Sequence, residues 1–176
     1  MTVQGLEDKD VFVCIHSPKI EHDEYFNGDL YLKFFTSDRN ETGNVEWQDL
    51  SIQGGDSSGW KTPDINEIHG VSIAAGDFDG DGYKNEIAVC LRVKYHVYAY
   101  FYRLTIENGQ AKVQRIYDTT IYNVGFADTI PNQHPIPNVV TGDFDGDGYD
   151  EAAFVNNILD TYYDDSNNCI VVSIVK

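Results

Sequence analysis

The chain has 176 residues and a formal net charge of −17, and hydrophobic residues make up 41% of it. This apolar content is too high for a disordered acidic tail, and the length allows one domain with a core of its own. The acidic excess argues against nucleic acid as a partner, because phosphates would be repelled. The sequence also contains no run of about 18 apolar residues that could span a membrane.

The first part of the chain predicts three strands. They are KDVFVCIHS at 9–17, DLYLKFFTSD at 29–38 and VEWQDLSI at 45–52. Aromatic and β-branched residues are frequent in these segments, and such residues favour sheet over helix.

The second part repeats this order and places one more strand in front of it. The predicted strands are HGVSIAA at 69–75, EIAVCLRV at 86–93, HVYAYFYRLTI at 96–106 and AKVQRIYDTTI at 111–121. Between the last two stand Asn108 and Gly109, which both tolerate positive φ. This pair is a strong signal for a hairpin turn.

The last part follows the same order again, with strands predicted at 136–141, 151–159 and 169–176. No segment shows a sustained helical period, so no substantial helix is expected. We therefore interpret residues 1–176 as a single repeat domain with three units, at approximately 8–68, 69–135 and 136–176. The first unit has a degenerate loop, and the third is incomplete.

Four-stranded units repeated along a chain are typical of the blades of a β-propeller. The sequence thus predicts an all-β fold with about two and a half propeller-type blades, and a β-sandwich is the alternative. Closed propellers have about four to eight blades. We therefore expect either an excised piece of a longer protein, which we favour, or several copies that close a ring together.

An eight-residue sequence, GDFDGDGY, occurs twice, at 76–83 and at 142–149. In each copy three aspartates alternate with a phenylalanine and a glycine, so a tight loop can turn three carboxylates toward one point. Carboxylates about 4 Å apart repel by about 1 kcal/mol per pair in water, and by several times more near a protein surface. The repeat therefore predicts a bound cation at each loop. Oxygen ligands favour a hard ion such as Ca²⁺, whereas zinc or copper would favour His or Cys.

The EF-hand loop also begins D-x-D-x-D-G, but it requires a bidentate Glu at position 12 and a helix on each side. Position 12 is Ala88 after the first copy and Phe154 after the second, and both lie in predicted strands. These residues exclude an EF-hand.

Both copies and their flanking strands resemble the FG-GAP (VCBS) repeat, the calcium loop of integrin α-subunit propellers and of many bacterial surface proteins. In that family a D-x-D-x-D-G-x-x-D loop joins the first two strands of a blade. Side chains at positions 1, 3, 5 and 9 and the carbonyl at position 7 bind Ca²⁺. For the second loop the resemblance implies Asp143, Asp145, Asp147, the Tyr149 carbonyl and Glu151. For the first loop it implies Asp77, Asp79, Asp81 and the Tyr83 carbonyl.

The ninth position of the first loop differs from the family pattern. It is occupied by Asn85, and Glu86 follows one residue later. This difference looks like a one-residue insertion, so either side chain could complete the first site, and we favour Glu86.

The three cysteines are Cys14, Cys90 and Cys169, and they form no CxxC pair. Neither a disulfide framework nor a zinc site is therefore indicated. Cys14 and Cys90 stand in similar apolar contexts, and we expect buried structural thiols, although the redox compartment stays open.

The resemblance implies a calcium-binding segment of an extracellular or cell-surface protein, although no signal peptide is visible. Ca²⁺ would have a structural role, and exposed loops would recognise a glycan or a protein in adhesion. Two links between predicted strands, PKIEHDEYFNG at 18–28 and DTYYDDSNN at 160–168, vary in length and sequence, and we call them the variable links. Their aromatic residues Tyr25, Phe26, Tyr162 and Tyr163 are candidates for ligand binding, and packing against a neighbouring unit is the alternative. Other expected partners are further blades of the same longer chain, or other copies of it.

No nucleophile elbow, P-loop or dinucleotide motif occurs, and the five histidines show no paired spacing. We therefore expect no catalytic site. The alternative function is the propeller portion of a carbohydrate-active enzyme such as a polysaccharide lyase, since some of these resemble the same family.

Overall fold

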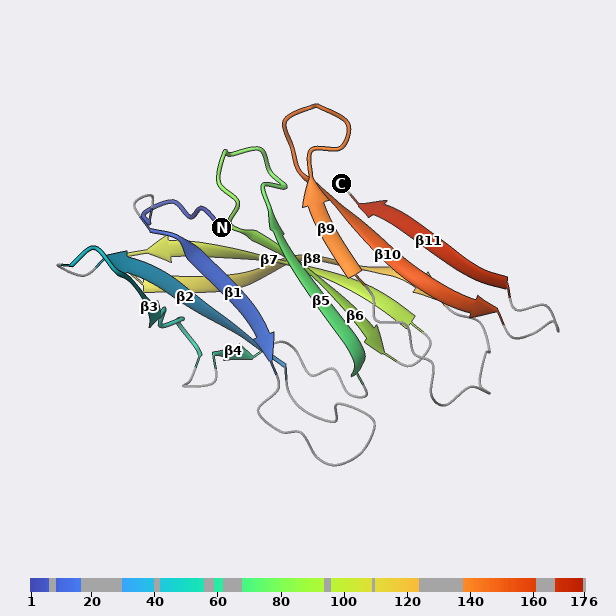
Figure 1. The fold of residues 1–176 in the computed structure, drawn as a ribbon, viewed down its shortest axis with the longest axis horizontal. Coiled ribbons are helices and arrows are strands. Elements are labelled where there is room, and N and C mark those ends of the chain that lie inside the picture. Colours follow the sequence, from blue (N-terminus) through green and yellow to red (C-terminus); the bar gives the residue numbers. More distant parts are fainter. Residues whose placement is uncertain are drawn as a thin grey trace.

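The structure is a computed structural model, and it describes residues 1–6, 9–16, 30–39, 42–55, 59–61, 68–93, 96–108, 110–123, 138–160 and 167–175. Within these ranges the chain is all-β and forms three antiparallel sheets (Figure 1). The same ranges include no helix, and so none that could cross a membrane. The prediction of an all-β fold is confirmed.

The first sheet has the order β1-β2-β3. Its strands are β1 (Val11–His16), β2 (Tyr31–Arg39) and β3 (Val45–Asp49). A short strand that the sequence did not predict, β4 (Trp60–Lys61), pairs with the first two residues of β2. Since β1 pairs with the same residues of β2 from the other side, β3 and β4 share one edge of β2 and act as an interrupted strand.

The second sheet is a four-stranded meander with the order β5-β6-β7-β8. Its strands are β5 (Ile68–Gly76), β6 (Glu86–Val93), β7 (His96–Glu107) and β8 (Gln110–Asn123). Each strand pairs with the next along the chain, as expected for a complete unit. Asn108, between β7 and β8, has φ 52°, which confirms the predicted turn conformation at this residue.

The third sheet repeats the first three strands of the second. It consists of β9 (Asn138–Gly142), β10 (Glu151–Asp160) and β11 (Asn167–Val175), with β10 in the centre. The registers correspond, because Glu151 lies opposite Gly142 as Glu86 lies opposite Gly76. In Figure 1 the second sheet lies between the first and the third, and β9 runs beside β5.

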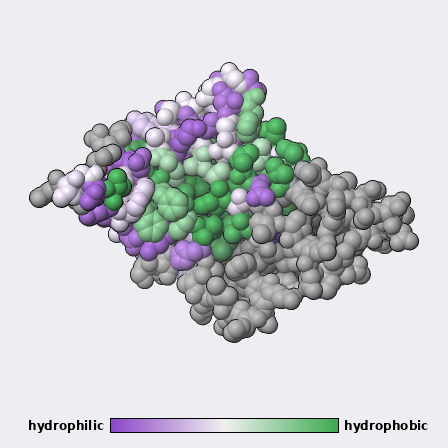
Figure 2. Space-filling model, viewed as in Figure 1, coloured by the Kyte–Doolittle hydropathy of each residue, from purple (hydrophilic) through white to green (hydrophobic). Residues whose placement is uncertain are grey.

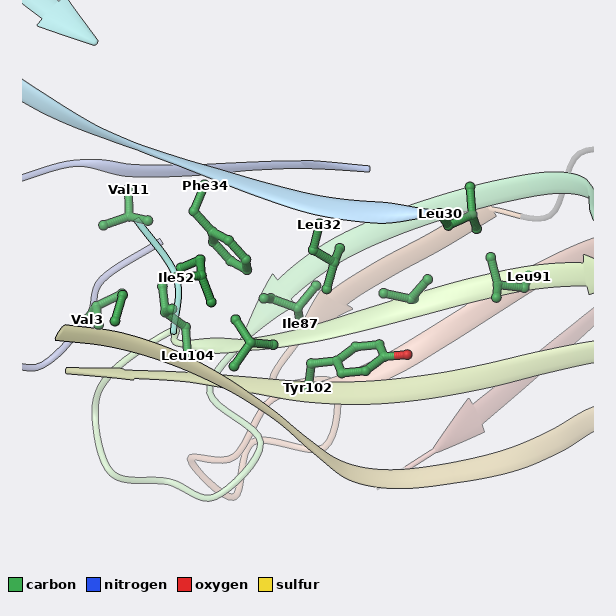
Figure 3. Packing of buried hydrophobic residues seen from close by; sticks show 13 residues of the cluster. Val3, Val11, Leu30, Leu32, Phe34, Ile52, Ile87, Leu91, Tyr102 and Leu104 are labelled. Atoms are coloured by element: carbon green, nitrogen blue, oxygen red, sulfur yellow. The ribbon is translucent and has the colours of Figure 1, made fainter. Parts of the chain in front are cut away.

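The larger core lies between the first and second sheets. Phe34 and Leu32 of β2 meet Ile87 and Tyr102 of the second sheet, and all four side chains are fully buried. Figure 3 shows these side chains pointing toward one another from the two sheets. Alternate residues of each strand supply the contact, as the pleat of a strand requires.

A smaller core lies between the second and third sheets. Ala88 and Phe101 come from the second sheet, and Val139, Ala152 and Phe154 come from the third. Phe101 and Phe154 meet edge to face with their ring centroids 6.2 Å apart. The second sheet is therefore covered on both faces, while the first and third are each covered by it on one face.

The cysteines differ in their environments. Cys90 is fully buried between the second and third sheets, and burial raises the pKa of its thiol to about 12. Cys14 is only half-buried, because it alternates along β1 with residues that face the second sheet. The expectation of buried thiols is therefore confirmed for Cys90 and wrong for Cys14. The side chain of Cys169 lies outside the described residues.

Tyr102 carries a buried hydroxyl that finds no hydrogen-bond partner among the described residues. A buried polar group without a partner costs about 1–3 kcal/mol. We therefore expect Tyr102→Phe to leave the free energy of unfolding unchanged or to raise it by up to about 1 kcal/mol. Tyr102→Ala should lower it by about 3–5 kcal/mol, because it leaves a cavity.

Denaturant unfolding measures both effects, and Tyr117→Phe is the matched control because the Tyr117 side chain is exposed. A clear loss of stability in Tyr102→Phe would show that this hydroxyl has a partner after all.

Candidate metal centres

The two copies of GDFDGDGY adopt the same place in the fold. The first connects β5 to β6 and the second connects β9 to β10, so each joins the first two strands of its unit. Gly80 and Gly82 have positive φ in the first loop, as do Gly146 and Gly148 in the second. The identical sequences thus form loops with the same pattern of backbone conformations.

In the first loop the aspartates accept hydrogen bonds from the loop backbone. Asp77 accepts the N–H of Asp81 at 3.0 Å and that of Gly82 at 2.8 Å. Asp79 Oδ1 accepts the Asp81 N–H at 3.2 Å, and Asp81 Oδ1 accepts the Tyr83 N–H at 2.8 Å. The carboxylates therefore turn inward and are fixed there by the chain that carries them.

The second loop repeats these bonds. Asp143 accepts the N–H groups of Asp147 and Gly148, both at 3.0 Å, and also that of Gly146 at 2.6 Å. Asp145 Oδ1 accepts the Asp147 N–H at 3.2 Å, and Asp147 Oδ1 accepts the Tyr149 N–H at 3.0 Å. Tyr83 and Tyr149, whose carbonyls the resemblance implies as ligands, thus occupy equivalent positions.

A glutamate closes each loop in the same way. Glu86 Oε2 accepts the N–H of Phe78 at 3.1 Å, and Glu151 Oε2 accepts the N–H of Phe144 at 2.9 Å. Glu86, and not Asn85, is therefore the structural counterpart of Glu151. Asn85 is the inserted residue, and its backbone carbonyl accepts the Leu104 N–H at 2.9 Å. The Asn85 side chain is buried, and its Oδ1 has no hydrogen-bond partner among the described residues.

Each loop gathers three acidic side chains that could hold a metal ion. They are Asp77, Asp79 and Asp81 in the first loop, and Asp143, Asp145 and Glu151 in the second. Within each group, one ligand atom from every residue lies within 4.8 Å of the others. Carboxylate oxygens are hard ligands, and such a donor set fits Ca²⁺ better than zinc or copper. Glu86 is outside the first group, and Asp147 is outside the second.

Glu86 is held instead by Arg103, a residue that the sequence analysis did not single out. Arg103 Nε donates to Glu86 Oε1 at 2.7 Å, and Arg103 Nη2 donates to Asp79 Oδ2. Burial raises the pKa of Glu86 and the charge of Asp79 raises it further, while Arg103 acts in the opposite direction. Arg103 on β7 therefore supplies a positive charge to the carboxylates of the first loop. Strand pairing could have revealed it, because Arg103 lies directly opposite Glu86 across β6 and β7.

The two loops also contact each other through Asp150. Its N–H donates to the Asp77 carbonyl at 2.7 Å, and its Oδ2 accepts the Asp77 N–H at 2.9 Å. Lys84 Nζ donates to the same carboxylate at 2.7 Å. Burial alone would raise the pKa of Asp150, but Lys84 and the Asp77 N–H outweigh it, and the pKa is lowered. The second loop is thus bonded to the first.

The Tyr149 ring covers the backbone of the first loop at Gly80. A Cβ atom placed on Gly80 would lie 2.5 Å from Cε1 of this ring, which is closer than two carbon atoms can approach. Gly80 is therefore favoured for its positive φ, and any larger residue there would displace the half-exposed Tyr149 ring.

The four candidate aromatics of the variable links, Tyr25, Phe26, Tyr162 and Tyr163, lie outside the described residues. Comparisons of the chain with protein-family models, with curated proteins and with solved structures found no match.

Substitution of the loop glycines separates backbone strain from the contact between loops. Gly82 also has positive φ, at 87°, but a Cβ there would meet nothing within 4 Å. We expect Gly82→Ala to lower the free energy of unfolding by about 1–2 kcal/mol, the cost of a left-handed non-glycine residue. Gly80→Ala should lower it further because of the clash with Tyr149.

A double-mutant cycle measures the contact itself. In the Tyr149→Ala background the difference between Gly80→Ala and Gly82→Ala should disappear. If the two glycine variants are equally stable in the wild-type background, the Tyr149 ring does not pack on this loop in solution.

Proposed function

We propose that this chain is a calcium-binding segment of β-propeller type from an extracellular or cell-surface protein, in which Ca²⁺ has a structural role. The observation that carries the proposal is the gathering of three carboxylates at each of two loops that occupy the same place in successive sheets. The resemblance to the FG-GAP repeat supports it from the sequence.

The arrangement of the sheets also supports the propeller interpretation over a sandwich. Successive units stack in chain order, and the second and third share the same strand order and register. Two layers suffice for a sandwich, whereas here a third sheet packs on the far face of the second.

The residues fit a calcium ion, and when bound it would supply positive charge among carboxylates that otherwise repel. Asp77, Asp79 and Asp81 would hold it in the first loop, and Asp143, Asp145 and Glu151 in the second. Asp150 bonds the second loop to the first, so fixing either loop would also stiffen the joint between the second and third sheets.

An extracellular setting agrees with this role, since calcium modules outside the cell bind at about 10⁻⁴–10⁻³ M. In this proposal the variable links present a surface to a glycan or a protein ligand. An enzymatic role has no observation among the described residues that favours it.

Thermal unfolding in calcium and in excess chelator tests the proposal. At about ten times Kd each occupied site should add roughly 1.4 kcal/mol of stability, so the Tm should rise in calcium. Asp145→Asn should remove about one of the two contributions, and isothermal titration should then count one site instead of two.

Glu107→Gln is the matched control, because it removes one exposed negative charge at the β7–β8 turn, away from both loops. It should keep the full calcium response. An identical Tm in calcium and in chelator for the wild-type chain would refute the proposal.

Arg103 should compete with calcium for the carboxylates of the first loop. In Arg103→Gln the buried Glu86 loses its partner, and breaking a buried ion pair costs about 3–5 kcal/mol. Arg103 is one-third exposed, so we expect the lower end of this range in chelator. Calcium should restore part of the loss, because Asp79 and Glu86 then become available to the ion.

The measured quantity is the stability gained from calcium, which should be larger in Arg103→Gln than in the wild type. Arg115→Gln, which removes an exposed positive charge on β8, is the control. An equal gain in both variants would mean that Arg103 does not compete with the ion.

A further inference from the structure

Exposed apolar side chains gather on the two end faces of the stack of sheets. Ten large hydrophobic residues among those described are exposed. Seven of them lie on sides turned away from the second sheet. In the first sheet they are Phe12, Val45 and Trp47, and in the third sheet with its β9–β10 loop they are Val140, Phe144, Val172 and Ile174. Figure 2 shows one side of the molecule, where hydrophobic residues gather in the centre and hydrophilic ones lie at the left and top.

The outer face of the third sheet is formed by residues in register. Val140, Ala153 and Ile174 lie opposite one another across β9, β10 and β11. Val155 and Val172 form the next pair on the same face. Val172 and Ile174 are 57% and 61% exposed, which is unusual for aliphatic side chains in a continuous row.

The corresponding face of the second sheet is already covered. Its matching row is Ala74, Ala88 and Phe101, and its next pair is Cys90 and Ala99. Four of these five are buried by the third sheet, and Ala74 packs against the same cluster. The repeat therefore uses this face to bind another sheet of its own kind.

The loop phenylalanines show the same difference. Phe78 of the first loop packs edge to face on Phe101 at 5.2 Å and contributes to the core between the second and third sheets. Phe144 occupies the equivalent position in the second loop and is 51% exposed. The third sheet thus presents the equivalent face of its three strands, loop aromatic included, with nothing among the described residues packed on it.

The first sheet of a second copy offers a candidate partner for this face. Its outer face carries Phe12, Phe35 and Trp47, with Phe12 lying 6.1 Å from Phe35 and 6.3 Å from Trp47 between ring centroids. This face lies at the position in the first sheet from which the second and third sheets contact the sheet before them. Among the described residues it is the other sheet face with several exposed hydrophobic side chains, and it also carries Lys33, which lies over the Phe35 ring and pairs with Asp49 at 2.9 Å.

We propose that copies of this chain associate head to tail, with the outer face of the third sheet of one copy bound to the outer face of the first sheet of the next. The contact repeats between copies the packing of sheets that the chain already makes within itself. Because the two faces differ, the contact is heterologous and leads to a ring if the rotation closes, or to a filament if it does not. This proposal goes beyond calcium binding and does not depend on it.

Sedimentation velocity over a series of protein concentrations tests the proposal, in calcium and in chelator. The net charge of −17 opposes association of copies. Association should therefore become stronger as salt is added, because the Debye length falls to about 3 Å at 1 M. The wild-type chain should show a sedimentation coefficient that rises with concentration past the dimer.

Two variants each remove one face. Ile174→Lys disables the third-sheet face, and Trp47→Lys disables the first-sheet face. Both positions are exposed, so we expect each variant to fold, and circular dichroism checks this. Ile116→Lys is the matched control, because Ile116 is exposed on β8, on neither face.

Each single variant should sediment as a monomer, whereas an equimolar mixture of the two should give a dimer and nothing larger. In the mixture the intact third-sheet face of Trp47→Lys can bind the intact first-sheet face of Ile174→Lys. The two faces left over in that dimer are both disabled, so it cannot grow. Ile116→Lys should associate like the wild type. The proposal is overturned if the wild type stays monomeric at every concentration, if the control variant also dissociates, or if the mixture of single variants stays monomeric.

Discussion

The fold depends on one constraint, namely that the second sheet is packed on both of its faces. Ile87, Val89 and Leu91 of β6 point to the first sheet, while Ala88 and Cys90 point to the third. A strand buried on both sides has no polar positions to alternate with, which explains the unbroken apolar run at its centre. The small side chains of Ala88 and Cys90 allow the third sheet to approach closely, with β9 beside β5. Within the described ranges each end sheet packs on the second sheet with one face, and its other face carries the exposed aromatic and aliphatic residues.

The acidic loops are built on the same repetition, and in the first of them a cation of the protein itself shares the carboxylates. In both, aspartate oxygens accept N–H groups of the loop, and a carboxylate oxygen that accepts one bond retains lone pairs for a cation. In the first loop, Arg103 reaches from the neighbouring strand to Asp79 and Glu86 and neutralises part of the charge. An ion at the first loop would therefore share its carboxylates with the guanidinium of Arg103.

The strands could be predicted from the sequence because repetition and aromatic content signal them directly. All ten predicted strands are present, with ends shifted by up to three residues. The sequence could not reveal β4, because two residues after a glycine-rich segment carry no periodic pattern. The equivalence of Glu86 with Glu151 could also be predicted from the sequence, since a one-residue insertion at Asn85 restores the match. Arg103 and Asp150 were missed because their roles arise from pairing across strands and between sheets. The burial of Cys14 was predicted wrongly, because the similar apolar residues around Cys14 and Cys90 do not determine which face of each strand is covered by another sheet.

The charges of Lys84 and Asp150 have a consequence for the order of the units. These residues occupy the same place in the first and second loops, directly after GDFDGDGY, and they meet as an ion pair across the joint. A copy of the third unit stacked on another third unit would bring two carboxylates together at that point instead of opposite charges. The units are therefore not interchangeable, because the ion pair between Lys84 and Asp150 forms only when the second unit precedes the third. Permuted or duplicated arrangements of the same sheets would meet repulsion where the native sequence has attraction.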